Sequence, residues 1–171
     1  SSDLEDGPGN IYCNEIPWDD MKKQYDFVDE FEKLGTLIHS AGEKSRYDYW
    51  NHTFQAMKRT AEIGCLWGSF EIHCKADSHE SALADYKGLL RAVEELEYHL
   101  LMAVESNGDM GVITDIQQRA VTPILRQCKD KLTKWYSDLP ELKENVVDKA
   151  LRLVVPTART SLQRGEDLRL K

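Results

Sequence analysis

The sequence has little of what an all-β or a disulfide-rich protein needs. Its 171 residues include 5 prolines and 10 glycines, which leaves few turn-forming residues for a many-stranded protein. The four cysteines (Cys13, Cys65, Cys74 and Cys128) are too sparse and too irregularly spaced for a disulfide scaffold. No stretch approaches the ~18 apolar residues that span a bilayer, and no signal-peptide pattern is present. We therefore expect a cytoplasmic protein with free thiols.

Motifs of the common enzyme and metal classes are also missing. There is no P-loop, dinucleotide-binding fingerprint, H-E-x-x-H or G-x-S-x-G. The Glu-x-x-His pairs of di-iron bundles are absent, and Glu95 and His99, four residues apart, lie at the edge of an apolar stripe where a solvated pair is expected. The sequence positions of Cys65, His73, Cys74 and His79 match no zinc module. We predict no catalytic residue, no metal ligand and no cofactor.

Basic residues are scarce at the start of the chain. The net charge is −8; residues 1–32 hold ten acidic and two basic residues, whereas residues 119–171 hold twelve basic and seven acidic ones. The favoured interpretation is that the acidic segment folds onto the basic part of its own chain. The alternative is that the basic part attracts an anionic partner, either a membrane surface or an acidic protein. An acidic domain is a poor match for duplex nucleic acid, so we predict no nucleic-acid partner.

Apolar residues recur every three or four positions along most of the chain, which predicts amphipathic helices. We expect an all-α fold, an elongated up-and-down antiparallel bundle of four to five long helices. Residues 1–15 form a flexible acidic segment and residues 16–171 a single helical-bundle domain. The predicted helices cover residues 17–42, 45–74, 77–107, 112–137 and 138–162, with Pro123 interrupting or dividing the fourth and Pro156 kinking the fifth.

Two local patterns carry structural predictions. Asp77 followed by Glu80 resembles a capping box at the start of the third helix. Ala61, Gly64 and Gly68 stack small residues along one face of the second helix, which indicates that another backbone approaches it closely; the alternative is that the helix breaks at one of the glycines. The alternating run 67–73 has no partner strand and is assigned to this helix.

The aromatic residues provide the candidate contact surface. Trp50 and Trp135 fit the apolar stripes of their helices and are expected in the core. Trp18 lies in the first helical turn, and Trp67 falls off the stripe of its helix beside Phe70. Because exposed tryptophans often anchor interfaces, we predict that Trp18, Trp67 and Phe70 contact a partner; local packing at the bundle ends is the alternative.

Basic residues near the C-terminal end are a second candidate surface, for an anionic partner. These residues are Arg126, Lys129, Lys131, Lys134, Arg152 and Arg159. Asp130 and Asp138 lie among them and dilute the positive patch, which argues against a strong lipid-headgroup site.

The expected function is non-catalytic. We predict a helical-bundle protein–protein interaction domain, an adaptor or scaffold part of a larger protein in a trafficking or cytoskeletal setting. The first alternative is a membrane-associated domain that uses the basic C-terminal helices. The second is a small metal-dependent or Cys/His enzyme. The sequence does not specify an oligomeric state.

Overall fold

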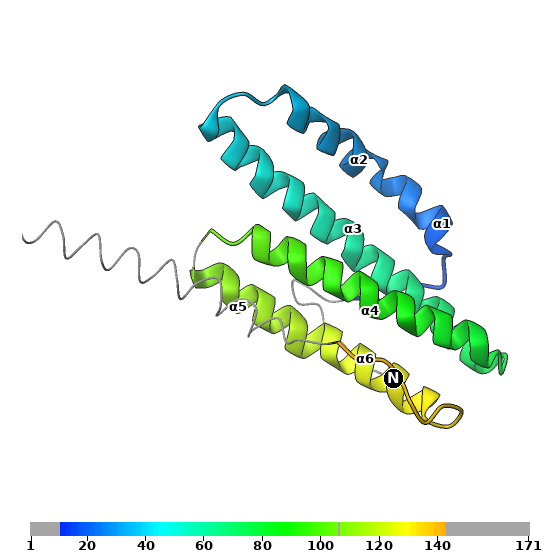
Figure 1. Ribbon diagram of the computed structural model, residues 1–171. Helices are drawn as coiled ribbons and strands as arrows, with labels where there is room; N and C mark the ends of the chain where they lie inside the picture. Colours follow the sequence, from blue (N-terminus) through cyan, green and yellow to red (C-terminus); the bar gives the residue numbers. More distant parts are fainter. Residues whose placement is uncertain (1–10, 106, 143–171) are drawn as a thin grey trace, which may run out of the picture. The chain divides into compact units, whose positions relative to one another are not determined.

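The computed structural model describes residues 11–105 and 107–142. The chain divides into two units, Ser1–Glu141 and Leu142–Lys171, and the elements below belong to the first. Every regular element in the described ranges is helical, and four helices pack against one another (Figure 1). The predicted all-α class is therefore confirmed for this part of the chain, including the run 67–73, which is helical.

Two long antiparallel helices form the centre of the fold. α3 (Ala41–Lys75) has 35 residues, α4 (His79–Met102) has 24, and the turn 76–78 joins them. They contribute most of the largest fully buried side chains in the described residues, among them Ile63, Phe70, Tyr86, Leu89, Val93 and Leu96. Burying each of these side chains contributes about 1.5–3 kcal/mol, so the α3–α4 contact is the main source of stability in the described region.

α3 begins earlier than the sequence predicts. The Ser40 side chain accepts a hydrogen bond of 3.2 Å from the backbone N–H of Glu43, which is the geometry of a helix N-cap. Glu43 lies in the first turn, where the helix dipole favours negative charge. The predicted break between Gly42 and Ser45 is therefore wrong, and Gly42 lies inside the first turn of α3.

The turn between α3 and α4 is a C-terminal capping motif. Asp77 adopts a left-handed conformation with φ of 57°. The N–H of Ser78 donates to the carbonyl of His73 at 2.9 Å, and the N–H of Asp77 to that of Cys74 at 3.2 Å, which is a Schellman arrangement. The predicted capping box is wrong, because Asp77 ends α3 and Ser78 precedes α4.

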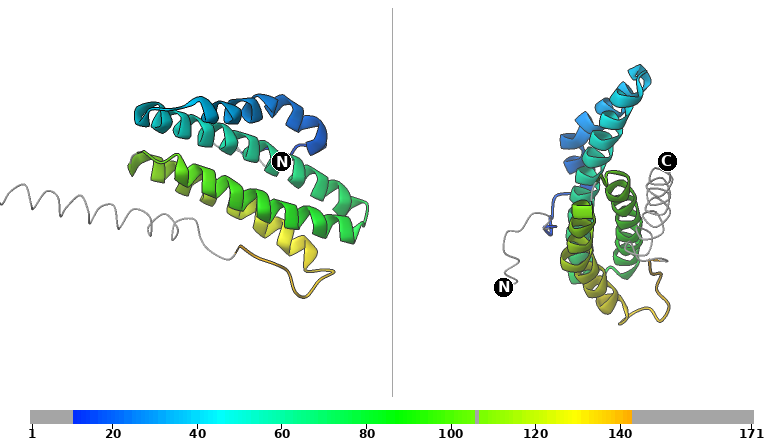
Figure 2. Two further views of the ribbon diagram at one scale, coloured as in Figure 1. Left: turned by 45° about the horizontal axis from the view of Figure 1, so that its top comes forward. Right: turned by 90° about the vertical axis from the view of Figure 1, so that its left-hand side faces the viewer.

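The first predicted helix is divided into four short pieces. They are α1 (Trp18–Met21), the 3₁₀ helix η1 (Lys22–Tyr25), α2 (Asp26–Lys33) and the 3₁₀ helix η2 (Leu34–Leu37). Together they run beside the first half of α3 and form a helical hairpin with it (Figures 1 and 2). Val28 is the fully buried residue of this segment.

The fourth predicted helix contains a wide turn before its proline. α5 (Asn107–Ile116) continues through the π-helix η3 (Gln117–Val121) into α6 (Thr122–Leu132), which packs against α4. Pro123 has no N–H to donate to the carbonyl of Arg119, and the π-turn accommodates that missing bond. Both predicted options, interruption and division at Pro123, describe part of this arrangement.

The chain leaves helical structure after α6. Residues 136–142 have no regular structure, and the buried Tyr86 hydroxyl donates a 3.0 Å hydrogen bond to the carbonyl of Pro140. The predicted helix start at Asp138 is therefore wrong as far as residue 142. The rest of the fifth predicted helix, including Pro156, lies outside the described residues.

Residues 11–16, which we call the N-terminal strap, lie across α3. Ile11 is buried, and the N–H of Asn14 donates a 3.0 Å hydrogen bond to the carbonyl of Gly64. A Cβ atom at Gly64 or Gly68 would overlap the strap's backbone. The predicted close approach at these glycines is confirmed, and the approaching backbone is the strap. Flexibility of residues 1–15 stays a prediction, but residues 11–14 have a defined place.

Candidate functional site

The three predicted partner-contact residues occupy different environments. Trp18 is half-buried, and its ring lies 6.3 Å from that of Tyr25. Trp67 is half-buried and lines a cavity of about 70 Å³ with Ile11 and residues of η3 and α6. Phe70 is fully buried in the core. Phe70 is therefore unavailable to a partner in this structure, and Trp67 packs between the strap and η3–α6.

The predicted basic surface is partly neutralised within the molecule. Lys131 forms an ion pair with Glu71 at 2.5 Å, and Lys129 pairs with Glu141. Arg126 and Lys134 line a shallow surface hollow along α6. Arg152 and Arg159 lie outside the described residues. The structure thus brings four of the six predicted residues to α6 or the turn after it, and two of these four are in ion pairs.

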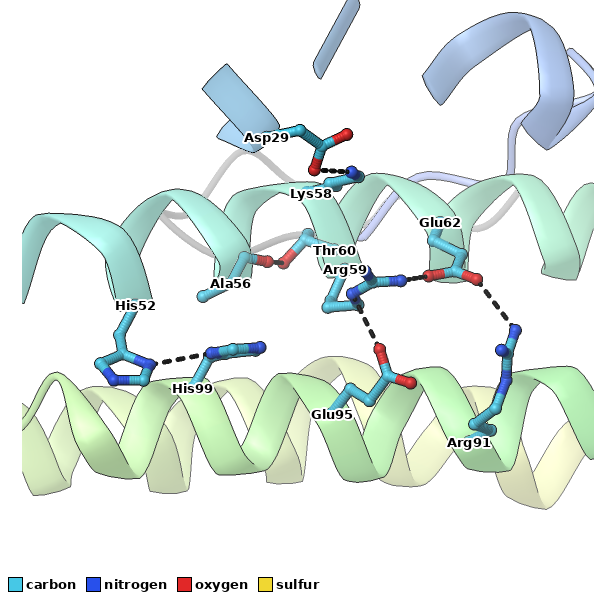
Figure 3. A network of polar contacts seen from close by, with 10 residues as sticks. All are labelled: Asp29, His52, Ala56, Lys58, Arg59, Thr60, Glu62, Arg91, Glu95 and His99. Atoms are coloured by element: carbon cyan, nitrogen blue, oxygen red, sulfur yellow. Dashed lines mark hydrogen bonds and ion pairs between the residues drawn. The ribbon is translucent and has the colours of Figure 1, made fainter. Parts of the chain in front are cut away.

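Charged side chains also meet in the seam between α3 and α4. Glu62 is buried, and its carboxylate pairs with Arg59 of its own helix and with Arg91 of α4 at 3.3 Å (Figure 3). Arg59 also reaches Glu95 of α4 at 3.0 Å. A buried carboxylate needs such partners, because desolvation of an unpaired charge is costly. The network joins the two long helices and fixes how they align.

Two histidines continue this seam. The Nδ1 atoms of His52 and His99 lie 2.9 Å apart, so one ring donates its N–H to the other's lone pair (Figure 3). The pKa of His99 is lowered to about 4, mainly by burial and further by the nearby His52 and Arg59. Burial also lowers the pKa of His52. Both rings are therefore neutral at pH 7. Glu95 and His99, which were expected to form a solvated pair, instead contact Arg59 and His52 across the seam.

A serine, a histidine and an aspartate meet at the C-terminal end of α3, but without the geometry of a hydrolase triad. His73 Nδ1 lies 2.6 Å from an Asp85 carboxylate oxygen and 3.5 Å from Ser69 Oγ. In a triad the serine and the carboxylate contact opposite ring nitrogens, so that the imidazole can take the serine proton. Here both contact Nδ1, and Asp85 holds it closely. Ser69 is therefore not activated as a nucleophile.

The cysteines form no disulfide and have weakly acidic thiols. All four are free, and burial raises the pKa of the Cys65, Cys74 and Cys128 thiols. Since the thiolate is the reactive form, these side chains are poor nucleophiles. Among the described residues, no group of three or more His, Cys, Asp or Glu side chains could hold a metal ion. His79, one of the residues considered for a zinc site, instead stacks on the ring of Trp135, with 3.9 Å between the ring centroids.

A surface of which sequence reasoning identified only Trp18 is a run of aromatic contacts on the hairpin of α1, α2 and α3. Ring-to-ring contacts of 5.6–6.3 Å connect its aromatic members in the order Trp18, Tyr25, Phe27, Phe54 and Trp50. Met57 joins them, because it lines a groove of about 360 Å³ together with Tyr25. We call these six residues the aromatic strip.

The strip is unusually open to solvent. Phe27, Trp50 and Met57 are 46%, 49% and 48% exposed. The predicted core position of Trp50 is therefore wrong. A signal was available in the sequence: eight of the fifteen Phe, Trp and Tyr residues lie within residues 18–54.

Comparison with known proteins identifies no relative. No protein-family model matches the chain, no curated protein matches it, and no solved structure is significantly similar to it. Among the described helices, none combines the length and apolar character that crossing a bilayer requires. The function is therefore inferred from the geometry alone.

Proposed function

We propose that the protein is a non-catalytic helical-bundle domain for protein–protein interaction, an adaptor or scaffold whose aromatic strip binds a protein partner. The observation that carries this proposal is the half exposure of Phe27, Trp50 and Met57 within one continuous apolar surface. Contiguous exposed apolar patches larger than a few hundred Å² are rare on soluble monomers, and such patches mark interaction sites. Aromatic residues and methionine are also the types enriched in interfaces.

The polar clusters support a structural role better than a catalytic one. The seam contains ion pairs that satisfy one another across α3 and α4. Ser69 and the buried thiols lack activation, as their geometry and raised pKa values indicate. The side chains that would carry acid–base or nucleophilic chemistry therefore hold the helices together instead.

The membrane-associated alternative has weaker support. Lys129 and Lys131 are in ion pairs with Glu141 and Glu71, so they contribute little free positive charge for anionic lipid. The finer architecture that accompanies the proposal is an up-and-down bundle of four to five long helices in a cytoplasmic protein, with trafficking or cytoskeletal assembly as the expected setting.

Comparative capture from cells tests the proposed surface. Wild type, Trp50→Ala and Ile72→Ala are each used as bait, and the captured proteins are quantified by mass spectrometry. Ile72 is the matched control, because it is an exposed apolar residue of the same helix at 42% exposure. We expect Trp50→Ala to lose at least one protein that wild type and Ile72→Ala retain. Equal capture by all three, with unchanged helicity by circular dichroism, would contradict the proposal.

A further inference from the structure

Side chains are packed unevenly along the α3–α4 hairpin. The buried residues of α3 begin at Gln55 and those of α4 end at Glu97. Beyond them lie residues 41–54 of α3 and 98–102 of α4, which we call the open end of the hairpin. A hollow of about 380 Å³ lies there, and Tyr98 and Met102 are exposed. Because few buried contacts hold the open end, separating it requires less free energy than unfolding the whole domain.

The contact between His52 and His99 joins the two helices at this end and depends on how many protons the pair carries. The Nδ1 atoms lie 2.9 Å apart and the ring centroids 5.2 Å apart (Figure 3). In the neutral pair, one Nδ1 donates its proton and the other accepts it. A first added proton can bind the outer Nε2 of the donor ring and leave this bond intact. A second gives both Nδ1 atoms a proton, so no acceptor remains and two positive rings face each other.

The carboxylates near the two rings are already paired with other side chains. On α3, Asp48 lies near the first histidine but forms an ion pair with Lys44 at 3.0 Å. On α4, Glu95 lies one turn before the second histidine but pairs with Arg59 at 3.0 Å, and the charge of Arg59 opposes protonation of that ring. Tyr98 packs its ring against both imidazoles. Among its described residues, α5, which also contacts α4, has no charged group that acts on either ring.

We propose that His52 and His99 form an acid-sensitive switch: protonation of the pair separates the open end of the α3–α4 hairpin, while the rest of the hairpin stays packed. Separation removes the repulsion between the two charged rings and allows water to solvate them. The well-packed side chains between Gln55 and Glu97 resist propagation of the opening toward the turn 76–78. The switch is therefore local, and it responds to acid because of where the two histidines lie.

The sign and size of the response follow from proton linkage. In the open state a solvated histidine has a pKa of about 6.5, whereas burial and nearby charges lower the pKa of His99 to about 4 in the closed state. The open state therefore binds protons more readily, and it gains population as the pH falls below 6.5. For one such group, the ratio of open to closed molecules rises about twentyfold between pH 7 and pH 5.

Amide hydrogen exchange of the full chain at pH 7 and pH 5, corrected for the intrinsic exchange rate at each pH, tests the inference. In wild type we expect residues 98–102 to lose protection about twentyfold at pH 5, and residues 89–93 to keep theirs. The double variant His52→Gln with His99→Gln cannot titrate at these positions and should keep its protection at both pH values. His79→Gln is the matched control, because His79 stacks on Trp135 instead, and it should behave as wild type.

Three exchange results would overturn the switch: unchanged protection of residues 98–102 in wild type, an equal loss in residues 89–93, or the same loss in the double variant. An NMR titration of the imidazole signals in wild type gives a readout that does not depend on the double variant being folded. A midpoint near 4 for His99, with local loss of protection, supports the proposal. A midpoint of 6.5 or above would show that acid does not favour the open state, and it would overturn the proposal.

Discussion

Because the strap lies over Gly68, two glycine-to-alanine changes in α3 should have opposite effects on the free energy of unfolding. Alanine is favoured over glycine in a helix by about 1 kcal/mol. At Gly42 a Cβ meets nothing within 4 Å, so Gly42→Ala should raise the free energy of unfolding by about 0.5–1 kcal/mol. At Gly68 the added Cβ overlaps the carbonyl oxygen and carbon of Asn14. These are backbone atoms, which cannot rotate aside as the end of a side chain can.

The cost at Gly68 follows from what the strap loses when it moves. Release of Ile11 exposes a buried side chain worth about 1.5–3 kcal/mol. Loss of the Asn14–Gly64 hydrogen bond removes about 0.5–1.5 kcal/mol. The freed strap regains backbone entropy, which offsets a large part of this loss. After the helix-propensity gain is subtracted, we expect Gly68→Ala to lower the free energy of unfolding by about 1–2 kcal/mol.

Urea unfolding of wild type, Gly42→Ala and Gly68→Ala measures both changes. Amide hydrogen exchange adds a local readout, because the N–H of Asn14 is bonded to the carbonyl of Gly64 and should lose protection in Gly68→Ala alone. If Gly68→Ala stabilises the protein as Gly42→Ala does, or if Asn14 keeps its protection, the strap is not held against α3 and the reasoning is wrong.

Three further predictions concern the seam and the core. Between pH 6.5 and about 4 the unfolded chain binds more protons than the folded one, because the folded pKa of His99 is lowered to about 4. The contribution of His99 to the free energy of unfolding should be fully present above pH 6.5 and fall by about 1–2 kcal/mol toward pH 4, after allowance for the half-exposed ring. In unfolding measured against pH, His99→Gln should flatten this slope. Glu62→Gln should cost about 1–3 kcal/mol in urea unfolding, whereas Glu30→Gln, in an exposed pair with Lys33, should cost under about 0.5; equal costs would contradict the buried seam. Phe70→Ala should cost about 3–5 kcal/mol, and a loss below about 1 kcal/mol would mean that Phe70 is not in the core.

The sequence was sufficient for the helical class and for the close approach at α3. Helical periodicity reflects backbone geometry that holds in any tertiary context, so it identified α3 and α4 with errors at their ends. Gly64 and Gly68 were informative because few physical reasons explain two glycines on one face of a long helix. The element that approaches them could not be predicted, since the acidic composition of residues 1–15 gave no indication that Ile11 has a buried site.

Helix ends and tryptophan environments were harder to predict for a different reason. Whether Ser40 or a later residue caps α3 depends on side-chain geometry that periodicity does not contain. A single apolar stripe also assumes that a helix has one buried side. α3 contacts α2, α4, α6 and the strap, so Phe70, off the predicted stripe, is buried, and Trp50, on it, is half exposed.

The distribution of side chains around α3 is the strongest physical argument that its outer face has a partner. In a surface helix of a globular protein, charged residues usually face water and apolar residues face the core. In the middle of α3, the charged Arg59 and Glu62 lie in the seam with α4, while Trp50 and Met57 face outward. Desolvating the charges and exposing the apolar residues are both unfavourable for a free domain. A second molecule that covers Trp50 and Met57 removes the second cost, and the seam network offsets the first by pairing the charges.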